Sequence, residues 1–391
     1  MTLFAHSWHK ICGSDSLFCR SESSWLRAFI ICLIYALFCL GLVMIYSTAS
    51  AQQLDRALPL STPLALLAKQ LTHALIAIAI AYGLFLTPLK SWMAYSPWLM
   101  GALVLVLVLL LIPGWAREMN GSKRWFLLFG FSIQPSELVK VVMPSYLIAQ
   151  FSHSRPRSSQ EWCKRLCLPA LSILLVLLEP NNGTAALLLV ELLFLLWLLG
   201  TPWLVALLPL FLLMTAIGIS AISSPYVQSR LEVFWHPEKD LLGRGHQPHQ
   251  AKIAVGSGGL WGKGVGHSLQ KFSYLPEAHN DYIAAIFAEE FGFGGVTLLI
   301  TLWMLLAATL FSLCLECQQV PHLCLLAAAM SFGLLTQATM NLAVVVGLCP
   351  ATGLNLPFFS HGGCSLLASC CAIALALKAH KESTAHSSIV P

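Results

Sequence analysis

Runs of about 20 apolar residues, each long enough to cross a bilayer, recur along the whole chain and constrain its fold more than any other feature. Charged residues make up only 10% of the 391 residues, against about 25% in a typical soluble domain. We predict an all-α, polytopic membrane protein with one large polar loop, 224–285, between the seventh and eighth helices. The ten expected transmembrane helices cover 26–48, 66–87, 92–113, 133–152, 166–180, 183–200, 203–223, 286–314, 322–347 and 363–378.

The distribution of basic residues predicts the orientation, because cytoplasmic loops of membrane proteins carry the excess of Lys and Arg. An even number of helices puts both chain ends on one side. Cytoplasmic ends would place inside Lys10, Arg20, Arg27, Lys90, Arg155, Arg157, Lys164, Arg165, Lys378 and Lys381. We therefore expect cytoplasmic tails at 1–25 and 379–391, a membrane domain over 26–378, and an extracytoplasmic 224–285 loop. No basic block is interleaved with aromatic residues, which argues against nucleic-acid binding.

Four polar segments fall on the predicted outer side of the membrane: 120–125, 179–184, 243–290 and 357–363. Irregular backbone at membrane depth persists only where protein or a water-filled cavity satisfies its polar groups. The four segments therefore predict a shared cavity that opens to the outside.

The third of these segments carries the strongest candidate residues for chemistry. Glu277 and Asp281 are four residues apart, a spacing that puts both carboxylates on one face of a helix. Glu277 has a second interpretation, in which it pairs with His279 or Lys271 and shapes the loop. Glu289 and Glu290 open the eighth predicted helix, where the helix dipole favours carboxylates, and we interpret both as structural.

Ionisable residues inside the predicted helices are a further source of candidates, since an unpaired charge at membrane depth is costly. Glu137 and Lys140 are three residues apart in the fourth helix, so they either face the cavity or form a structural pair that closes the bundle. Glu191, alone in the sixth helix, has no partner evident from the sequence. Two more residues have two interpretations each. Trp125 either stacks on a sugar or anchors the chain at the membrane interface. His361 either contacts a ligand or only forms part of a turn.

Two familiar sites are excluded by spacing. The glycine-rich segment 256–264 resembles a phosphate-binding loop, but five residues separate its outer glycines and Gly264 follows the lysine, so nucleotide hydrolysis is not supported. The histidines of the outer loop lack the spacing of zinc ligands. Cys314 and Cys317 form a lone C-x-x-C pattern, which we interpret as small apolar residues in a bundle.

Five motifs in this order resemble the SEDS family of bacterial cell-wall polymerases, whose branches are FtsW, RodA and SpoVE, and the resemblance runs from about residue 25 to 378. The matching segments are Gly121-Ser-Lys-Arg-Trp125, Gln134-Pro-Ser-Glu-Leu138, Gly256-Ser-Gly-Gly-Leu-Trp-Gly-Lys-Gly264, Leu275-Pro-Glu-Ala-His279 with Asp281, and Asn355-Leu-Pro-Phe-Phe-Ser-His-Gly-Gly363. The segment 270–279 is more similar to the FtsW branch than to RodA, which favours a role in cell division over elongation.

The resemblance implies a ten-helix peptidoglycan glycosyltransferase of the bacterial cytoplasmic membrane, at the division septum. It would polymerise lipid II on the outer face, aided by a divalent cation (Mg²⁺ or Mn²⁺), a class B penicillin-binding protein and other divisome proteins. The family's essential aspartate maps onto Asp281. Three positions depart from the family pattern: Asn181 replaces an aspartate, His361 a tyrosine and Cys364 a serine.

The chemistry of lipid II suggests how one carboxylate serves this reaction. A pyrophosphate leaving group departs without a general acid, so the remaining need is a base for the attacking sugar hydroxyl. Asp281 is the expected base or, with Glu277, a ligand of the cation. A lipid II flippase and a scaffold for a synthase are the alternatives, and the absence of an internal repeat favours the enzyme over a transporter. The expected substrate-binding residues are Lys123, Arg124, Trp125, Glu137, Lys140, Lys263, Glu277, His279, Ser360 and His361.

Overall fold

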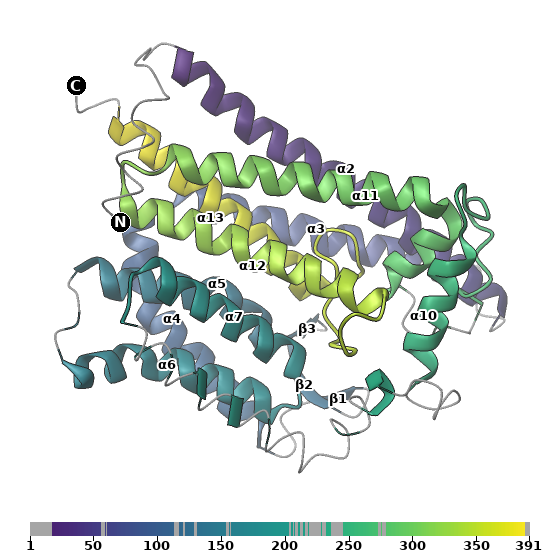
Figure 1. Cartoon of the computed structure of the whole chain (residues 1–391), viewed down its shortest axis with the longest axis horizontal. Coiled ribbons are helices and arrows are strands. Elements are labelled where there is room, and N and C mark those ends of the chain that lie inside the picture. Colours follow the sequence, from purple (N-terminus) through teal and green to yellow (C-terminus); the bar gives the residue numbers. More distant parts are fainter. Residues whose placement is uncertain are drawn as a thin grey trace.

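The protein is a bundle of long helices that run side by side, with a small sheet, a short helix and several loops gathered at one end (Figure 1). This computed structural model describes residues 18–55, 61–112, 117–119, 122–128, 131–153, 158–202, 245–272 and 279–387, together with single positions between these ranges. Side chains at some ends of these ranges, including 18–23, are not described.

The described helices match nine of the ten predicted apolar runs. They are α2 (Phe18–Asp55), α3 (Thr62–Leu86), α4 (Leu89–Leu110), α5 (Pro135–His153), α6 (Ser159–Leu178), α7 (Asn182–Leu198), α11 (Ile283–Glu316), α12 (Pro321–Val345) and α13 (Gly363–Ser387). Six of them, α2, α3, α4, α11, α12 and α13, are long and apolar enough to span a membrane. The seventh predicted run, 203–223, lies mostly outside the described residues.

Two groups of helices build the bundle. In Figure 1, α2, α3, α11, α12 and α13 form one group and α4, α5, α6 and α7 the other. α13 packs against both α3 and α12, while α5 packs against α4, α12 and α13 and so joins the groups. Along α5, residues 141–149 are all buried. The centre of the bundle is therefore where α5, α12 and α13 meet.

The outer surface of the bundle carries large apolar side chains. Leu75, Trp98, Met304 and Phe311 are each at least 66% exposed. Backbone polar groups of these helices are satisfied within each helix, which is the arrangement that a lipid environment requires. These exposed side chains therefore form a lipid-facing surface.

A three-stranded antiparallel sheet interrupts the all-helical pattern between α4 and α5. Its strands are β1 (Arg117–Met119), β2 (Ser122–Leu128) and β3 (Phe131–Ile133), in that order. The apolar-run pattern does not predict these strands, because β1 and β3 have only three residues and the seven residues of β2, with polar residues first and apolar residues after them, do not alternate. β2 carries Arg124 and Trp125, so the sheet presents the first of the four polar segments as an extended strand.

Within the large polar loop the structure describes one helix, α10 (His246–Ser257), and the segment that follows it. This segment, 258–264, lies against a kink in α11 at Gly292, where φ is 63°. A Cβ atom at Gly292 would stand 2.2 Å from the backbone nitrogen of Gly262, so neither backbone leaves space for a side chain there. Gly258 and Gly262 of the phosphate-loop-like motif thus serve close backbone packing against α11.

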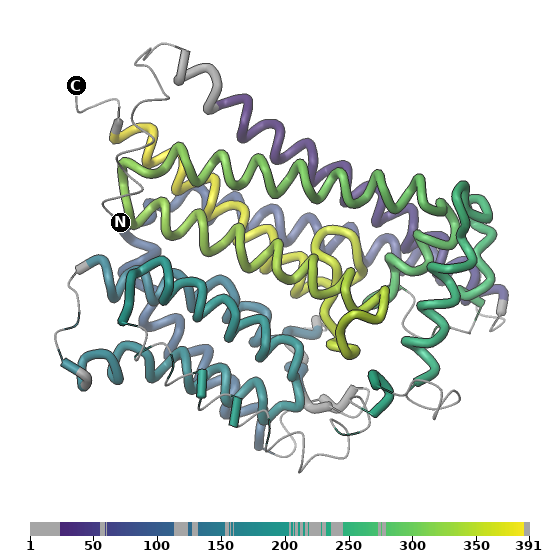
Figure 2. The backbone as a smooth tube through the Cα atoms, in the orientation of Figure 1, coloured from purple at the N-terminus to yellow at the C-terminus, as the bar shows by residue number. Residues whose placement is uncertain are grey.

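The two ends of the bundle are built from different elements. α2 begins and α13 ends at one end, and the sheet, α10 and the loop between α12 and α13 lie at the other (Figure 2). At the first end, His380 Nε2 of α13 is 2.6 Å from Glu316 Oε2 of α11. We refer below to the end with the sheet and loops as the loop end.

Candidate functional site

The loop end brings together the four polar segments that the sequence singles out. The strand β2 contacts the turn between α6 and α7, and this turn contacts the segment 346–362 between α12 and α13. The segment 346–362 in turn contacts the residues that precede α11. We call the segment 346–362 the central loop. It is the element through which the four segments meet.

Arg124 makes the first of these contacts, reaching from β2 to the turn between α6 and α7. Its Nε donates to the carbonyl of Glu179 (3.1 Å), its Nη2 donates to the carbonyl of Pro180, and its Nη1 lies 3.5 Å from Asn181 Oδ1. Asn181 Nδ2 in turn lies 3.3 Å from Ser136 Oγ of α5. Arg124, a predicted substrate-binding residue, therefore holds backbone carbonyls of the α6–α7 turn.

The central loop makes the next two contacts through backbone positions. Gly183, at the start of α7, has no space for a side chain, because a Cβ atom there would lie 2.5 Å from the carbonyl oxygen of Thr352. The neighbouring Gly353 has φ of 73°, and a Cβ atom on it would lie 3.7 Å from Asp281 Oδ2. The central loop thus touches the α6–α7 turn on one side and Asp281 on the other.

Asp281 lies just before α11, and its side chain is partly exposed. Asn341 of α12 holds its backbone: Nδ2 of Asn341 donates to the carbonyl of Asp281 (2.8 Å) and to the carbonyl of Leu354 (2.7 Å). One buried amide therefore fixes both the candidate catalytic residue and the central loop.

Three imidazoles lie next to this carboxylate segment. The rings of His279 and His361 are 5.7 Å apart between centroids, and those of His73 and His361 are 6.2 Å apart. Burial, with the nearby His279, His73 and Lys69, lowers the pKa of His361 to about 3. His361 is therefore a neutral imidazole at physiological pH, and its backbone N–H donates to the carbonyl of His279 (3.0 Å).

Ser360, another predicted substrate-binding residue, has its polar groups engaged within the fold. Its Oγ accepts a hydrogen bond from the N–H of Leu356 (2.9 Å), and its carbonyl lies 3.4 Å from Nε2 of Gln70 in α3. Gln70 Oε1 also lies 3.4 Å from the N–H of Gly362. Ser360 consequently shapes the central loop.

Glu137 and Lys140 form the predicted pair in the centre of the bundle. Lys140 Nζ lies 2.6 Å from Glu137 Oε2 and 2.7 Å from Gln337 Oε1, and both members of the pair are buried. Gln337 Nε2 donates to the carbonyl of Asn355 (2.9 Å) and to Ser365 Oγ (3.1 Å). The Glu137–Lys140 pair therefore contacts other protein side chains in the bundle. Through Gln337 it is hydrogen-bonded to the central loop.

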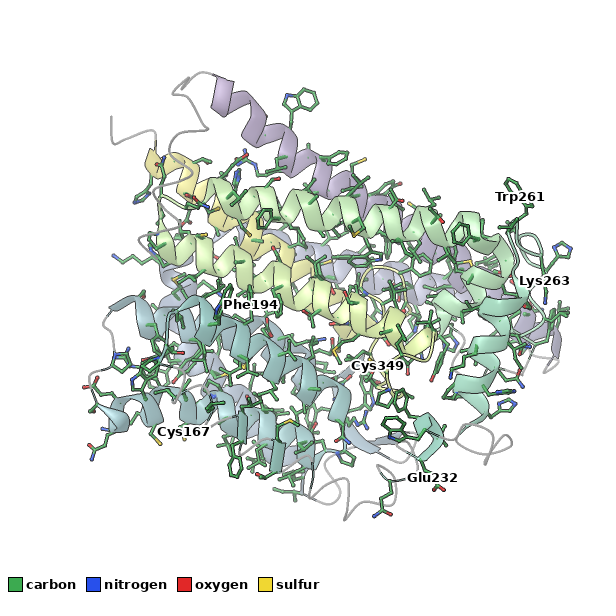
Figure 3. The ribbon with its side chains drawn as sticks, viewed as in Figure 1. Cys167, Phe194, Glu232, Trp261, Lys263 and Cys349 are labelled. Carbon is green, nitrogen blue, oxygen red and sulfur yellow. The ribbon has the colours of Figure 1, made fainter. Side chains whose placement is uncertain are left out.

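Lys263 lies in a separate cluster, away from these contacts. Its Nζ is 2.6 Å from Glu289 Oε1, and Trp261 beside it projects outward with 89% of its surface exposed (Figure 3). Lys271, which the sequence analysis offers as one possible partner of Glu277, has its Nζ 2.8 Å from Glu290 Oε1. Glu289 and Glu290 are thus structural as predicted, although they anchor the preceding loop and do not cap the helix.

Two predicted residues lie beyond what the structure describes. Glu277 is outside the described residues, and Lys123 lies in β2 but its side chain is not described. Trp125, in the same strand, is partly buried. The sequence interpretation missed the amides of Gln70, Gln337 and Asn341, whose only signal is a polar side chain within an apolar run. It also gave no role to Asn355, although this residue opens the last of the five motifs.

Among the described residues, no group of three His, Cys, Asp or Glu side chains is arranged to hold a metal ion. Mg²⁺ needs fewer protein ligands than that, because it is usually bound by one or two carboxylates together with substrate phosphates and water. Asp281, a partly exposed carboxylic residue, fits this requirement. A divalent cation at this position would therefore depend on the bound substrate for the rest of its ligands.

Glu179, in the turn between α6 and α7, makes the stability of the folded protein depend on pH. It is 1% exposed, and neither carboxylate oxygen has a hydrogen-bond partner. Burial raises the pKa of Glu179 to about 8, against a smaller lowering by Arg124. Between about pH 4.5 and 8 the unfolded chain loses this proton while the folded protein keeps it, so stability falls as pH rises through that window.

We expect Glu179→Gln to remove this part of the pH dependence. From pH 6 to pH 8.5 the native protein should lose up to a few kcal/mol of stability from this group, and the variant should lose much less. Thermal unfolding in detergent at the two pH values measures the difference. Glu161→Gln, at the exposed start of α6, is the matched control and should keep the native pH dependence. Equal slopes for native protein and Glu179→Gln would contradict the assignment.

Comparisons with known proteins identify the family that the chain matches. Residues 27–385 match the family of FtsW, RodA and SpoVE, described as cell cycle proteins. Over 350 residues the chain is 35% identical to a probable peptidoglycan glycosyltransferase FtsW of Nitrosomonas europaea, covering 87% of this chain and 88% of that protein. The protein of the same name from Coxiella burnetii is 34% identical, with 92% and 97% covered.

Solved structures give the same result for the fold. A chain from a structure titled as the coordination of polymerization and crosslinking by a peptidoglycan synthase complex superposes with a TM-score of 0.72, at 27% identity, covering 90% of this chain and 97% of that one. The rod shape determining protein RodA of Thermus thermophilus superposes with a TM-score of 0.65, at 28% identity, covering 90% and 96%. The likeness therefore extends over almost the whole chain.

Proposed function

The chain belongs to the FtsW, RodA and SpoVE family of cell cycle proteins and is a peptidoglycan glycosyltransferase, and from this premise we propose that it polymerises lipid II at the loop end, with Asp281 at the reacting centre. One observation carries this proposal. The four polar segments converge, through the central loop, on Asp281, whose side chain is partly exposed and whose backbone carbonyl accepts a hydrogen bond from Asn341.

In the proposed reaction Asp281 acts on the acceptor sugar. Its carboxylate takes the proton of the attacking hydroxyl as that oxygen bonds to the anomeric carbon of the donor, and the bond to the lipid pyrophosphate breaks. The pyrophosphate leaves as a stabilised anion and needs no general acid. A single displacement of this kind inverts the anomeric centre. One carboxylate is sufficient, in contrast to the acid and base pair of a typical glycosidase.

The negative charge of the donor's pyrophosphate also has to be balanced. A bound divalent cation would neutralise the pyrophosphate, and Asp281, with Glu277, is the carboxylate that would hold it. In this alternative Asp281 serves as a ligand and not as the base. His361 is a neutral neighbour, so it is suited to donate or accept hydrogen bonds with sugar or peptide groups without adding charge. His279 shares this environment.

The proposed setting is the bacterial cytoplasmic membrane at the division septum, with the loop end facing outward and both tails in the cytoplasm. The curated relatives named FtsW support division. The start of α2 and the end of α13 at the end opposite Asp281 are consistent with this orientation. A class B penicillin-binding protein and other divisome proteins are the proposed partners, supported by the likeness to a chain from a peptidoglycan synthase complex.

Purified protein in detergent tests this function, because no membrane remains to be crossed. We expect glycan strands to form from lipid II when Mg²⁺ or Mn²⁺ and the partner transpeptidase are supplied, and gel analysis of labelled lipid II measures them. A lipid II flippase or a scaffold predicts no polymer under these conditions. Folded protein that makes no polymer in the presence of cation and partner would overturn the proposal.

A further inference from the structure

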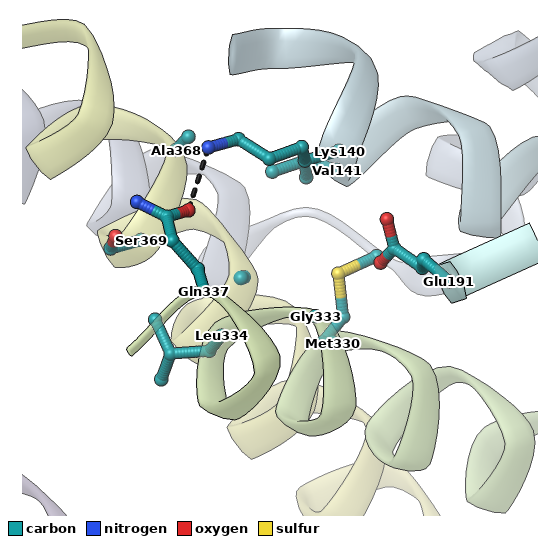
Figure 4. Close-up of a pocket in the computed structure, with 10 residues that line it drawn as sticks. Lys140, Val141, Glu191, Met330, Gly333, Leu334, Gln337, Ala368 and Ser369 are labelled. Carbon is teal, nitrogen blue, oxygen red and sulfur yellow. Dashed lines mark hydrogen bonds between the residues drawn. The ribbon is translucent and has the colours of Figure 1, made fainter. Parts of the chain in front are cut away.

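The two buried lysines among the described residues each have a carboxylate partner. Lys140 Nζ lies 2.6 Å from Glu137 Oε2 and also donates to Gln337 (Figure 4). Lys271 Nζ lies 2.8 Å from Glu290 Oε1. Such pairing is expected, because a charge without a partner is costly when it is taken out of water. The lysines at the end of the bundle opposite the loop end are arranged differently.

Lys378 and Lys381, one turn apart near the end of α13, converge on one aromatic ring. The Nζ atom of Lys378 lies 5.7 Å from the ring centre of Phe85 in α3, and that of Lys381 lies 5.1 Å from it. An aromatic face attracts a cation, but it does not neutralise the charge. Two ammonium groups are therefore held beside the same ring, where they repel each other.

Among the described residues, one carboxylate forms an ion pair with these two lysines, that of Glu382. Its Oε1 atom is 3.5 Å from Nζ of Lys378 and accepts a hydrogen bond from the N–H of Leu89 at the start of α4 (3.1 Å). Lys90, the next residue of α4, is exposed. We call Lys90, Lys378 and Lys381 the lysine cluster. With one glutamate beside three lysines, it carries an excess of positive charge.

The lysine cluster lies where lipid headgroups are expected. Helix α3 has 25 residues and is therefore about 37 Å long, enough to cross the apolar core of a bilayer, which is about 30 Å thick. Phe85 is the last residue but one of this helix. Its neighbours Tyr82 and Leu86 are both more than half exposed and belong to the lipid-facing surface. The lysines beside Phe85 thus stand at the boundary between acyl chains and headgroups.

We propose that the lysine cluster binds the phosphate of an anionic phospholipid, whose acyl chains lie along the exposed side of α3. The phosphate supplies the negative charge that the cluster lacks and accepts charge-assisted hydrogen bonds from the ammonium groups of Lys378 and Lys381. Basic residues at the end of a membrane-spanning helix attract anionic lipids in this way. A lipid is favoured over a free anion because apolar side chains are exposed directly beside the cluster.

Thermal unfolding of the full-length protein in an uncharged detergent tests the proposal. Phosphatidylglycerol should raise the unfolding temperature in a saturable manner, and phosphatidylcholine with the same acyl chains, which has no net charge, should raise it much less. Lys381→Gln should weaken phosphatidylglycerol binding about fivefold, and Lys378→Gln/Lys381→Gln about thirtyfold, since each basic residue at a membrane surface contributes to the attraction. Lys164→Gln, at an exposed position of α6, is the matched control and should bind as tightly as the native protein.

The same measurement without lipid shows whether the variants fold. Lys381→Gln should unfold at or above the native temperature, because it removes one of two like charges beside Phe85. The proposal is overturned if the two lipids stabilise the native protein equally, or if folded Lys381→Gln binds phosphatidylglycerol as tightly as the native protein. Inorganic phosphate alone that stabilises the native protein as much as the lipid would also overturn it, in favour of a free anion. None of these results bears on the proposed function at the loop end.

Discussion

Asp281→Asn is expected to lower the rate of glycan polymerisation at least about a hundredfold, because an amide cannot take the proton of the acceptor hydroxyl. The same change removes a charged ligand for a divalent cation, so the loss is expected under both roles of Asp281. Fold should be retained, since the contact that anchors this residue is made by its backbone carbonyl. Steady-state polymerisation of lipid II, together with thermal unfolding, measures both effects.

Two further measurements separate the roles of Asp281. If Asp281 is the base, the residual activity of the asparagine variant should not recover when the cation concentration is raised. If Asp281 is a cation ligand, higher Mg²⁺ or Mn²⁺ should restore part of the rate. Asn280→Asp, added to the Asp281→Asn variant, restores a negative charge one residue away. This control should not restore the rate of polymerisation. Native rates in a folded Asp281→Asn variant would remove this residue from catalysis.

The second large effect is expected at Glu289, which anchors the segment 258–272 to α11. Its carboxylate is fully buried and accepts hydrogen bonds from Lys263 Nζ, from Ser257 and Ser268, and from the backbone N–H groups of Leu269 and Gln270. Hydrogen bonds to a charged group contribute about 1.5–3 kcal/mol each. Glutamine replaces one of the two acceptor oxygens with an NH2 group, so several of these donors lose their partner at a combined cost of about 3 kcal/mol. Glu289→Gln should therefore loosen this segment.

Hydrogen exchange is the measurement suited to this change. The amides of residues 258–272 should exchange about a hundredfold faster in Glu289→Gln, as expected when local opening becomes about 3 kcal/mol easier. The amides of α12 and α13 should exchange at native rates. Glu161→Gln, an exposed glutamate on α6, should change neither region. Uniformly faster exchange across all helices would contradict a local anchoring role.

The helices were predictable from the sequence because each is set by a local property. Apolar runs long enough for a bilayer give the existence of a helix without any knowledge of its neighbours. The Glu137–Lys140 pair was predictable for the same reason, since three residues separate the partners on one helix. The convergence of the four polar segments followed from the expected topology and is confirmed by the contacts of Arg124, Gly183 and Gly353.

The partners of most site residues depend on tertiary contacts that a local pattern does not contain. Lys263 and Glu289 are 26 residues apart in the chain, and Lys140 and Gln337 are 197 apart. Nothing in the sequence around Lys263 distinguishes a phosphate ligand from an ion-pair partner. The sheet of β1, β2 and β3 was missed because β1 and β3 have only three residues and β2 does not alternate polar with apolar residues.

The way in which the central loop is held has a consequence for how such enzymes diversify. The amide side chains of Gln70, Gln337, Asn341 and Asn355 bind main-chain carbonyls of this loop and of its neighbours. A carbonyl is present at every position, whatever residue occupies it. Mutations along the loop can therefore change the side chains next to Asp281, as His361 illustrates, while the backbone path of the loop stays the same.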